Sequence, residues 1–233
     1  MLLAEDLLLL VTDDASGRLS APVATVDAGL GGANLIELTL LNKVDLSGEQ
    51  DQGKPGRIIV RDHSPPGDAV LDAALEAVIA HQGQKPSTVI KPLSKNLRQM
   101  LYQRLAGSGV VRAERGKIFG LFPSHRWPAQ DASREAEVRR LMTQALVQQE
   151  APDTRTAALI ALVHAIGCED KIIDPRQYGL SRRELRARAE QIAKGNWASE
   201  AVRKAIEETM AAVTAATTAA TIATTGAGGM PRC

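Results

Sequence analysis

Residues 156–166 read Thr-Ala-Ala-Leu-Ile-Ala-Leu-Val-His-Ala-Ile, a run without a single lysine, arginine or acidic side chain. A helix with this sequence would be apolar on nearly every face, and such a helix is stable only when other elements surround it. The run therefore predicts a helix over residues 153–168 at the centre of a helical bundle. His164 lies inside this helix, so we interpret it as a core histidine with a hydrogen-bond partner rather than as a metal ligand.

Apolar residues recur at helical spacing on both sides of this run, between residues that favour helix ends or turns. Asp68 is expected to be the N-cap of one of these helices, and Ser94 of another. Further helices are predicted over residues 2–11, 33–41, 70–79, 94–106, 131–149, 181–194 and 197–223. Short strands are predicted within 43–62, and a β-hairpin is predicted from 110–113 and 117–122, with Glu114-Arg115-Gly116 as its turn.

These elements define the expected fold class. It is a mostly α, single-domain helical bundle with a central apolar helix, short strands and a protruding apolar β-hairpin. The helical domain is expected to cover residues 1–210. Residues 211–233 are rich in Ala and Thr and end near Gly226-Ala227-Gly228-Gly229, so we expect a partly disordered C-terminal tail.

The composition bounds the function. The chain has 233 residues, of which 44% are hydrophobic, and its 28 Lys+Arg nearly balance its 27 Asp+Glu, which excludes nucleic-acid binding through overall positive charge. Cys168 and Cys233 cannot form a disulfide framework, so a cytoplasmic, reducing compartment is expected. Glu5 and Asp6 interrupt the apolar N-terminal run, so no signal peptide is expected. No stretch reaches the roughly 20 apolar residues of a bilayer span, so any membrane association would be peripheral.

Catalytic patterns are absent from the sequence. The four histidines are scattered, and neither an HExxH nor a CxxC motif occurs. Gly29-Leu30-Gly31-Gly32 lacks the spacing of a dinucleotide fingerprint and is interpreted as a tight turn that lets a helix pack closely. We therefore predict neither an enzyme nor a site for a metal or cofactor.

Charge is unevenly distributed along the chain. The first fifty residues are predominantly acidic, whereas residues 94–140 are predominantly basic. If Ser94 is an N-cap, Lys95 and Arg98 lie on one face of the first turn, where backbone N–H groups and both cations could converge on an anion. The alternative is that the two side chains point into water or pair with the acidic half of the chain.

The predicted hairpin carries an apolar set, Ile118, Phe119, Leu121 and Phe122, that cannot all face one side of a strand. Part of this set must therefore be covered by another element. The cover could be another part of the same chain, a second subunit, or lipid. Basic residues around the hairpin would favour an anionic membrane surface.

Five segments together resemble the Golgi phosphoprotein 3 family of peripheral membrane proteins, in what looks like a bacterial version. They lie in the family's order over roughly residues 2–208: 2–10, 29–38, 66–75, the Lys95-to-Arg98 segment with its hairpin, and 157–165. The resemblance implies a helical domain with a hairpin used in self-association. Eukaryotic relatives bind phosphatidylinositol 4-phosphate on the cytosolic face of Golgi membranes, and hold glycosylation enzymes there by their cytosolic tails.

The family's headgroup pocket uses a Trp, an Arg in the glycine segment, and two Arg on the helix before the hairpin. Lys95 and Arg98 occupy the last two positions, whereas Gly31 stands at the first Arg position and the Trp position falls near Pro22. The resemblance thus implies a headgroup site at Lys95, Arg98 and Gly31. It also implies hairpin contacts with membrane or a second copy, through the apolar set named above.

The function predicted is that of a cytoplasmic, peripherally membrane-associated protein. It would bind anionic phospholipid, by resemblance phosphatidylinositol 4-phosphate, form a homo-oligomer through the hairpin and serve as an adaptor for protein clients that the sequence does not identify. The alternative is a winged-helix DNA-binding regulator, because the helix of Leu97, Leu101 and Leu105 precedes a basic hairpin. Against this alternative, no helix-turn-helix pair precedes that helix.

Overall fold

Two buried helices, α2 (Val23–Leu40) and α7 (Thr154–Ala165), form the centre of the molecule. In α7 every residue from Thr156 to Val163 is buried, which confirms the central apolar helix predicted from the sequence. The computed structural model describes residues 1–48, 51, 54–118, 122–195 and 200–226. In this part of the chain α2 contacts α1, α3, α4, α5, α7 and α10, so it is a second central helix that the sequence did not single out.

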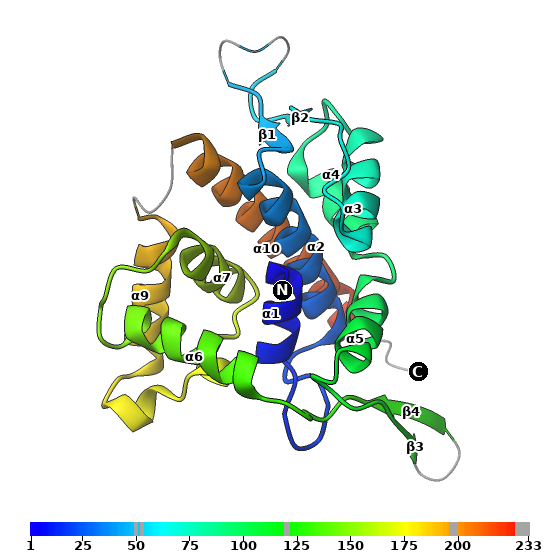
Figure 1. The fold of residues 1–233 in the computed structure, drawn as a ribbon. Helices are drawn as coiled ribbons and strands as arrows, with labels where there is room; N and C mark the ends of the chain where they lie inside the picture. The colour runs from blue at the N-terminus through cyan, green and yellow to red at the C-terminus, as the bar shows by residue number, and fades with distance from the viewer. Residues whose placement is uncertain (49–50, 52–53, 119–121, 196–199, 227–233) are drawn as a thin grey trace, which may run out of the picture.

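Most of the remaining chain is helical and surrounds these two helices, as predicted for a mostly α single domain. Figure 1 shows α6, α7 and α9 on one side of α1 and α2, with α3, α4 and α5 on the other side and α10 behind. The surrounding helices are α1 (Leu3–Leu10), α3 (Ala69–Ile79), α4 (Pro86–Ser94), α5 (Leu97–Gly107), α6 (Ser133–Leu146), α8 (Glu169–Ile172), α9 (Arg182–Ala193) and α10 (Glu200–Gly226), with a 3-10 helix at Pro175–Tyr178.

Two antiparallel strand pairs complete the fold. Strand β1 (Val44–Leu46) pairs with β2 (Ile58–Val60), in the region where short strands were predicted. Strand β3 (Glu114–Ile118) pairs with β4 (Phe122–Arg126), and this hairpin extends away from the helices in Figure 1. The predicted turn at Glu114-Arg115-Gly116 is wrong, because these residues lie within β3.

The expected tight turn at Gly29–Gly32 is also wrong, because these residues lie inside α2. The glycines instead allow three neighbours to approach this helix closely. A Cβ atom at Gly29 would lie 3.0 Å from the Ile166 side chain, one at Gly31 would lie 2.6 Å from a carbonyl oxygen of α4, and one at Gly32 would lie 2.5 Å from the Val213 side chain of α10. The glycine segment therefore permits close helix packing, as expected, but from within a helix and not from a turn.

The connection between α4 and α5 differs from the prediction as well. Ser94 ends α4, where its hydroxyl donates to the Lys91 carbonyl at 3.0 Å, so it is not the N-cap of α5. Lys95 is extended and Asn96 adopts the left-handed region, with φ 58°, before α5 begins at Leu97. The helix predicted over residues 94–106 therefore corresponds to α5, and α4, which precedes the bend, was not predicted.

The C-terminal helix α10 crosses residue 210, the expected end of the domain, without interruption. Its residues Ala212 and Val213 are buried, and α10 packs against α2, α4 and α7. The division into a domain over 1–210 and a tail over 211–233 stays a prediction, and residues 227–233 lie outside the described part of the chain.

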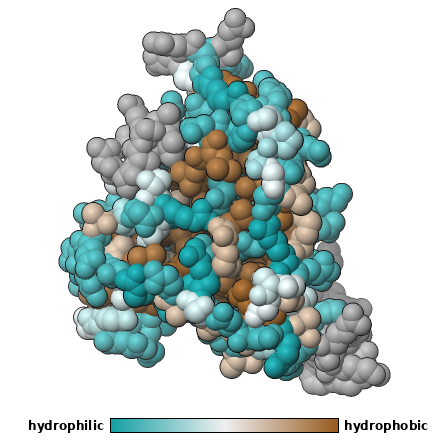
Figure 2. All heavy atoms as spheres, in the orientation of Figure 1, coloured by the Kyte–Doolittle hydropathy of each residue, from teal (hydrophilic) through white to brown (hydrophobic). Residues whose placement is uncertain are grey.

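The face of the molecule drawn in Figure 2 is mostly hydrophilic, with apolar groups gathered in the middle over α2. Among the described residues no helix is both long enough and apolar enough to cross a bilayer.

Candidate functional site

Arg98, a predicted site residue, lies at the start of α5 and pairs with Asp27 of α2. Its Nε donates to Asp27 Oδ1 at 2.8 Å, and each side chain is about a third exposed, at 32% and 31%. The pair therefore joins two helices at the protein surface. Asp27 was not singled out by the sequence analysis beyond its place in the acidic half of the chain, and pairing with that half was one of the alternatives left open for Arg98.

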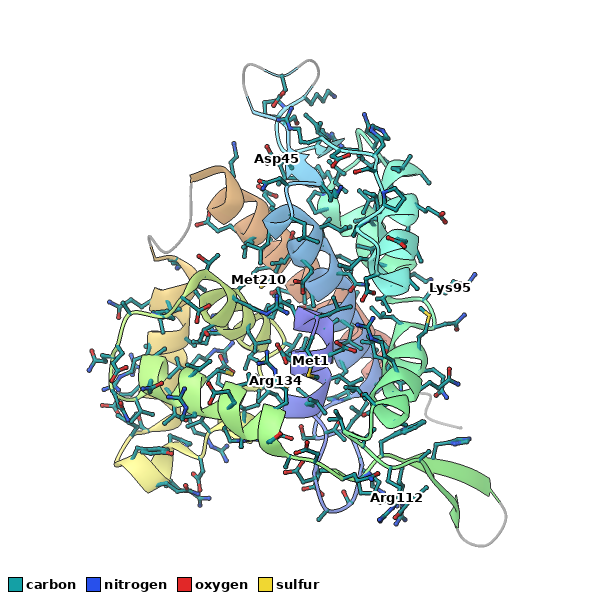
Figure 3. The ribbon with its side chains drawn as sticks, in the orientation of Figure 1. Met1, Asp45, Lys95, Arg112, Arg134 and Met210 are labelled. Carbon is teal, nitrogen blue, oxygen red and sulfur yellow. The ribbon has the colours of Figure 1, made fainter. Side chains whose placement is uncertain are left out.

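Lys95 lies at the bend between α4 and α5 and is exposed. No ion pair of its ammonium occurs within the part of the chain that the structure describes. Figure 3 shows the side chain extending from this bend into solvent. The expectation that Lys95 and Arg98 share one helical turn is wrong, because the backbone changes direction at Asn96.

Gly31 is buried in α2 and contributes no side chain to the surface. Its Cα faces the end of α4, where an added Cβ would meet the Ile90 carbonyl oxygen at 2.6 Å and the Ser94 Cβ at 3.4 Å. The close approach brings the C-terminal end of α4, which Lys95 follows, against the helix that holds Arg98 through Asp27. Gly31 thus positions the junction of α2, α4 and α5, which we call the three-helix junction.

The first turn of α2 comes just before Asp27, the residue that holds Arg98. Pro22 is the N-cap residue and supplies no side-chain cap, and Val23 is 50% exposed. The N–H groups of a first helical turn have no partner inside the helix and carry partial positive charge. The helix predicted over residues 33–41 begins ten residues later than α2 does. Pro22 is the signal that could have indicated the earlier start, since proline is common where helices begin.

Aromatic packing fixes α5 to the base of the hairpin. Tyr102 of α5 stacks on Trp127, which follows β4, with ring centroids 4.9 Å apart and an interplanar angle of 2°. The Tyr102 hydroxyl also shares a 2.7 Å hydrogen bond with Thr12, and burial raises the pKa of Tyr102. Because Tyr102 lies one turn after Arg98, the three-helix junction and the hairpin base share a rigid support.

The hairpin residues predicted to contact lipid or a second copy are only partly described. Phe119 and Leu121 lie outside the described residues. Ile118 and Phe122 are paired at the ends of β3 and β4, and their backbone alone is described. The contacts expected of these four residues stay predictions. At the base of the hairpin Arg112, which is labelled in Figure 3, pairs with Glu114.

The described residues contain no group of three or more His, Cys, Asp and Glu side chains able to hold a metal ion. His164 Nδ1 lies 2.6 Å from Glu169 Oε1, which confirms the expectation that this histidine has a hydrogen-bond partner. Cys168 is buried, and this burial raises the pKa of its thiol to about 11. A thiol with so high a pKa is a poor nucleophile at neutral pH.

The fold and the junction define a mostly helical, single-domain protein whose candidate site is a cationic meeting point of three helices. Comparison with known proteins identifies the family of this protein. The model of the Golgi phosphoprotein 3 (GPP34) family matches residues 3–209, so the chain belongs to the Golgi phosphoprotein 3 family. The family resemblance seen in the five sequence segments is thereby confirmed.

A curated relative is vacuolar protein sorting-associated protein 74 of Eremothecium gossypii. The two sequences are 26% identical over 221 residues, which cover 78% of this chain and 66% of the relative. The chain thus spans just under two thirds of the length of this relative. Neither comparison supports the DNA-binding alternative.

Proposed function

We propose that this chain is a cytoplasmic, peripherally membrane-associated protein that binds anionic phospholipid headgroups at the three-helix junction. Phosphatidylinositol 4-phosphate is the headgroup that the family resemblance favours. The observation that carries the proposal is the placement of two cations at the three-helix junction: Arg98, which Asp27 holds on α2, and the exposed Lys95. Membership of the Golgi phosphoprotein 3 family supports it.

Arg98 can bind a phosphate without losing its partner. Its contact with Asp27 uses Nε, and no hydrogen bond of its two Nη atoms is seen within the described chain. The guanidinium can therefore keep its position on α2 and direct Nη–H groups at a phosphate oxygen, a charge-assisted geometry that arginine favours. Asp27 acts here as a positioning residue.

Lys95 supplies the net positive charge of the site, because Asp27 offsets much of the charge of Arg98. Gly31 adds no cation, so the junction has fewer cations than the pocket implied by the family. A site of this kind selects for negative charge in the headgroup more than for its shape. We therefore expect binding to several acidic phospholipids, strongest for a phosphomonoester headgroup, which carries about −1.5 to −2 charge at neutral pH.

The hairpin would provide a second contact, either with lipid or with a second copy of the chain, and the protein would serve as an adaptor for membrane-associated partners. Its extension away from the helices and the nearby Arg112 support this role. A basic residue at an anionic membrane surface contributes about 1 kcal/mol.

Vesicle flotation tests the headgroup site. We expect Lys95→Ala to weaken binding to phosphatidylcholine vesicles containing phosphatidylinositol 4-phosphate about fivefold, the equivalent of about 1 kcal/mol. Arg98→Ala should weaken vesicle binding more than Lys95→Ala does, because Asp27 would then face the headgroup without a counter-ion. Vesicles with phosphatidylglycerol, and vesicles of phosphatidylcholine alone, measure selectivity and background.

Lys91→Ala is the matched control, since Lys91 is an exposed lysine one turn earlier on α4. It should bind as the wild type does if the junction, and not overall charge, determines binding. Equal binding by the wild type and the Lys95→Ala/Arg98→Ala double variant would rule out the junction as the headgroup site.

A further inference from the structure

A small polar cavity lies between the α1–α2 loop (residues 12–20) and the first turns of α6. Its volume is about 250 Å³, and its charged lining residues are Asp13, Asp14, Glu135, Arg139 and Lys171. Glu135 is only 5% exposed. It pairs with Arg139 of its own helix, and it also faces Asp14 of the loop. The cavity thus holds a carboxyl pair, Asp14 with Glu135, that is separate from the three-helix junction.

The other charged residues that line the cavity come from three elements. The loop supplies Asp13, α6 supplies Arg139, and α8 supplies Lys171. Arg134, the residue before Glu135, is engaged by Asp6 of α1. Burial raises the pKa of Glu135 from its ordinary value of 4.5 to about 7, the Arg139 guanidinium opposes this rise, and the adjacent Asp14 carboxyl adds to it. Near neutral pH the Glu135 carboxyl therefore gains or loses a proton.

The α1–α2 loop is held together by its own hydrogen bonds, so it moves as a unit. The Asp13 amide donates to the Arg18 carbonyl at 2.8 Å, and the Gly17 amide donates to the Asp13 carbonyl at 2.7 Å. The Asp13 carboxylate accepts a further hydrogen bond from the Ser16 amide at 2.7 Å. A displacement of Asp14 would therefore be transmitted to Gly17.

The same loop contacts the base of the hairpin. The Trp127 amide donates to the Gly17 carbonyl at 3.0 Å, and the Ala129 amide donates to the Asp14 carbonyl at 2.9 Å. Gly17, at φ 62°, packs so closely that an added Cβ would lie 2.2 Å from the Trp127 nitrogen. The Arg112 amide in turn donates to the Pro128 carbonyl at 2.9 Å, which joins the chain entering the hairpin to the chain leaving it.

We propose that the Asp14–Glu135 carboxyl pair is a proton-dependent contact that fixes the hairpin base to the helical body through the α1–α2 loop. When one carboxyl is protonated, its O–H donates to the other and the loop stays closed on α6. When both are ionised, they repel each other across the cavity and the loop opens more often. The inference does not depend on whether the three-helix junction binds lipid.

The pH dependence follows from proton linkage. The closed loop binds a proton on Glu135 that the open loop releases, so opening becomes more frequent as the pH rises. Between about pH 5 and about pH 7 the opening equilibrium should rise with pH, by at most tenfold per pH unit, because one proton is released. Above about pH 7 it should level off, because Glu135 is then ionised in both forms.

Hydrogen exchange of the Trp127 and Ala129 amides tests this inference. Protection factors, which correct for the intrinsic pH dependence of exchange, should fall across this range in the wild type and level off above it. The Leu162 amide in the buried helix α7 monitors global unfolding. Local opening requires Trp127 and Ala129 to be less protected than Leu162 at each pH.

Glu135→Gln retains a hydrogen-bond donor for Asp14 but cannot titrate, so its protection factors should not change with pH. Asp14→Asn, in an exposed turn, should abolish the pH dependence in the same way and serves if the Glu135 variant does not fold. Glu137→Gln is the matched control: it removes an exposed glutamate of the same helix that pairs with Arg140. It should behave as the wild type does.

Three outcomes would overturn the inference. The first is a flat profile for the wild type, and the second is a pH dependence that survives in both Glu135→Gln and Asp14→Asn. The third is loss of the pH dependence in Glu137→Gln, which would show that the effect comes from the overall charge of α6 and not from the Asp14–Glu135 pair.

Discussion

Gly31 shows how a buried residue without a side chain shapes the candidate site. A Cβ added at this position, where the family resemblance implies an arginine in eukaryotic relatives, would lie 2.6 Å from the Ile90 carbonyl oxygen. Real Cβ atoms do not approach a backbone oxygen so closely, so any side chain here would separate α4 from α2. Close packing of these helices and a cation at position 31 are therefore mutually exclusive.

Gly31→Ala should consequently destabilise the protein by about 1–3 kcal/mol, the usual cost of inserting a methyl group into a packed interface. Urea unfolding followed by circular dichroism would measure the change. Gly107→Ala, at the end of α5, is the control, since a Cβ there meets open space and alanine favours helix. A Gly31→Ala protein as stable as the wild type would show that α4 moves aside at little cost.

Individual residues were predictable from the sequence where their partners are close in the chain. Asp68 does cap α3, accepting from the Val70 amide at 3.0 Å, and this N-cap was predicted. Gly31 was interpreted incorrectly because its contact, Ile90, is remote in sequence and belongs to a helix that was not predicted. For Arg98, pairing with the acidic half of the chain was one of the alternatives predicted, but its partner, Asp27, was not identified.

At the scale of elements, the bend between α4 and α5 determines where the two predicted cations lie. Ser94 is a good N-cap residue, so the sequence favoured one helix that begins there and carries Lys95 and Arg98 in its first turn. Pro92 occurs inside α4, and Asn96 adopts the left-handed conformation that asparagine tolerates better than most residues. The helical spacing of Leu97, Leu101 and Leu105 was predicted correctly, whereas the bend before it depends on packing against α2.

The helix at the centre depends on its N-cap. Asp153 accepts hydrogen bonds from the Arg155 amide at 2.9 Å and the Thr156 amide at 3.1 Å. Partial burial works against its ionised form, but hydrogen bonds from the Thr156 hydroxyl and these amides outweigh it and lower the pKa of Asp153. The stabilisation by this cap is therefore fully present above the ordinary aspartate pKa. It is lost as the pH falls through the lowered pKa of Asp153.

Asp153→Ala should lower the free energy of unfolding at neutral pH by about 1 kcal/mol, because two amides of α7 lose their acceptor. Asp153→Ser keeps a capping oxygen and should restore most of the loss. Thermal or urea unfolding of both variants measures the effect. If the alanine and serine variants were equally unstable, a contact other than the cap would be responsible.

At the scale of the whole molecule, the uneven charge of the sequence is largely resolved by internal pairing. Acidic residues of the first two helices pair with arginines from later helices, and these pairs hold distant parts of the chain together. They are Arg98–Asp27, Arg104–Glu5, Arg134–Asp6 and Arg155–Glu37. Lys95 belongs to the basic segment but not to this set, so its positive charge is available to the proposed headgroup site beside the paired Arg98.

Mostly helical architecture and a buried α7 could be predicted because helical periodicity is a local property of sequence. The central position of α2 could not, because it follows from which helices pack around it. Its glycines suggested a turn when examined without those neighbours. The apolar hairpin was predicted with its turn in the wrong place, since Gly116 is a turn signal that the pairing of Glu114 with Arg126 overrides.

Substitution of Arg155 is the clearest test of whether these ion pairs between helices stabilise the fold. This residue of α7 contacts both α1 and α2. Its guanidinium donates to Glu37 Oε1 at 2.7 Å and to the Met1 carbonyl at 2.6 Å, and it lies 3.8 Å from Asp6 (the labelled Met1 lies at the centre of Figure 3). Glu37 and Asp6 are buried. Removing the cation would leave Glu37 without its arginine, whereas Asp6 would keep Arg134.

Arg155→Ala should therefore lower the free energy of unfolding by about 2 kcal/mol, less than the 3–5 kcal/mol typical of a fully buried pair, because Arg155 is partly exposed and Asp6 keeps a partner. Arg140→Ala removes an arginine that is paired with Glu137 on the surface of α6, and it should change the free energy by less than about 0.5 kcal/mol. Urea unfolding at pH 7 compares the two variants. Equal stability would mean that the cross-helix pairs contribute no more than a surface pair does. In that case burial of apolar side chains alone, and not charge pairing, would hold α1, α2 and α7 together.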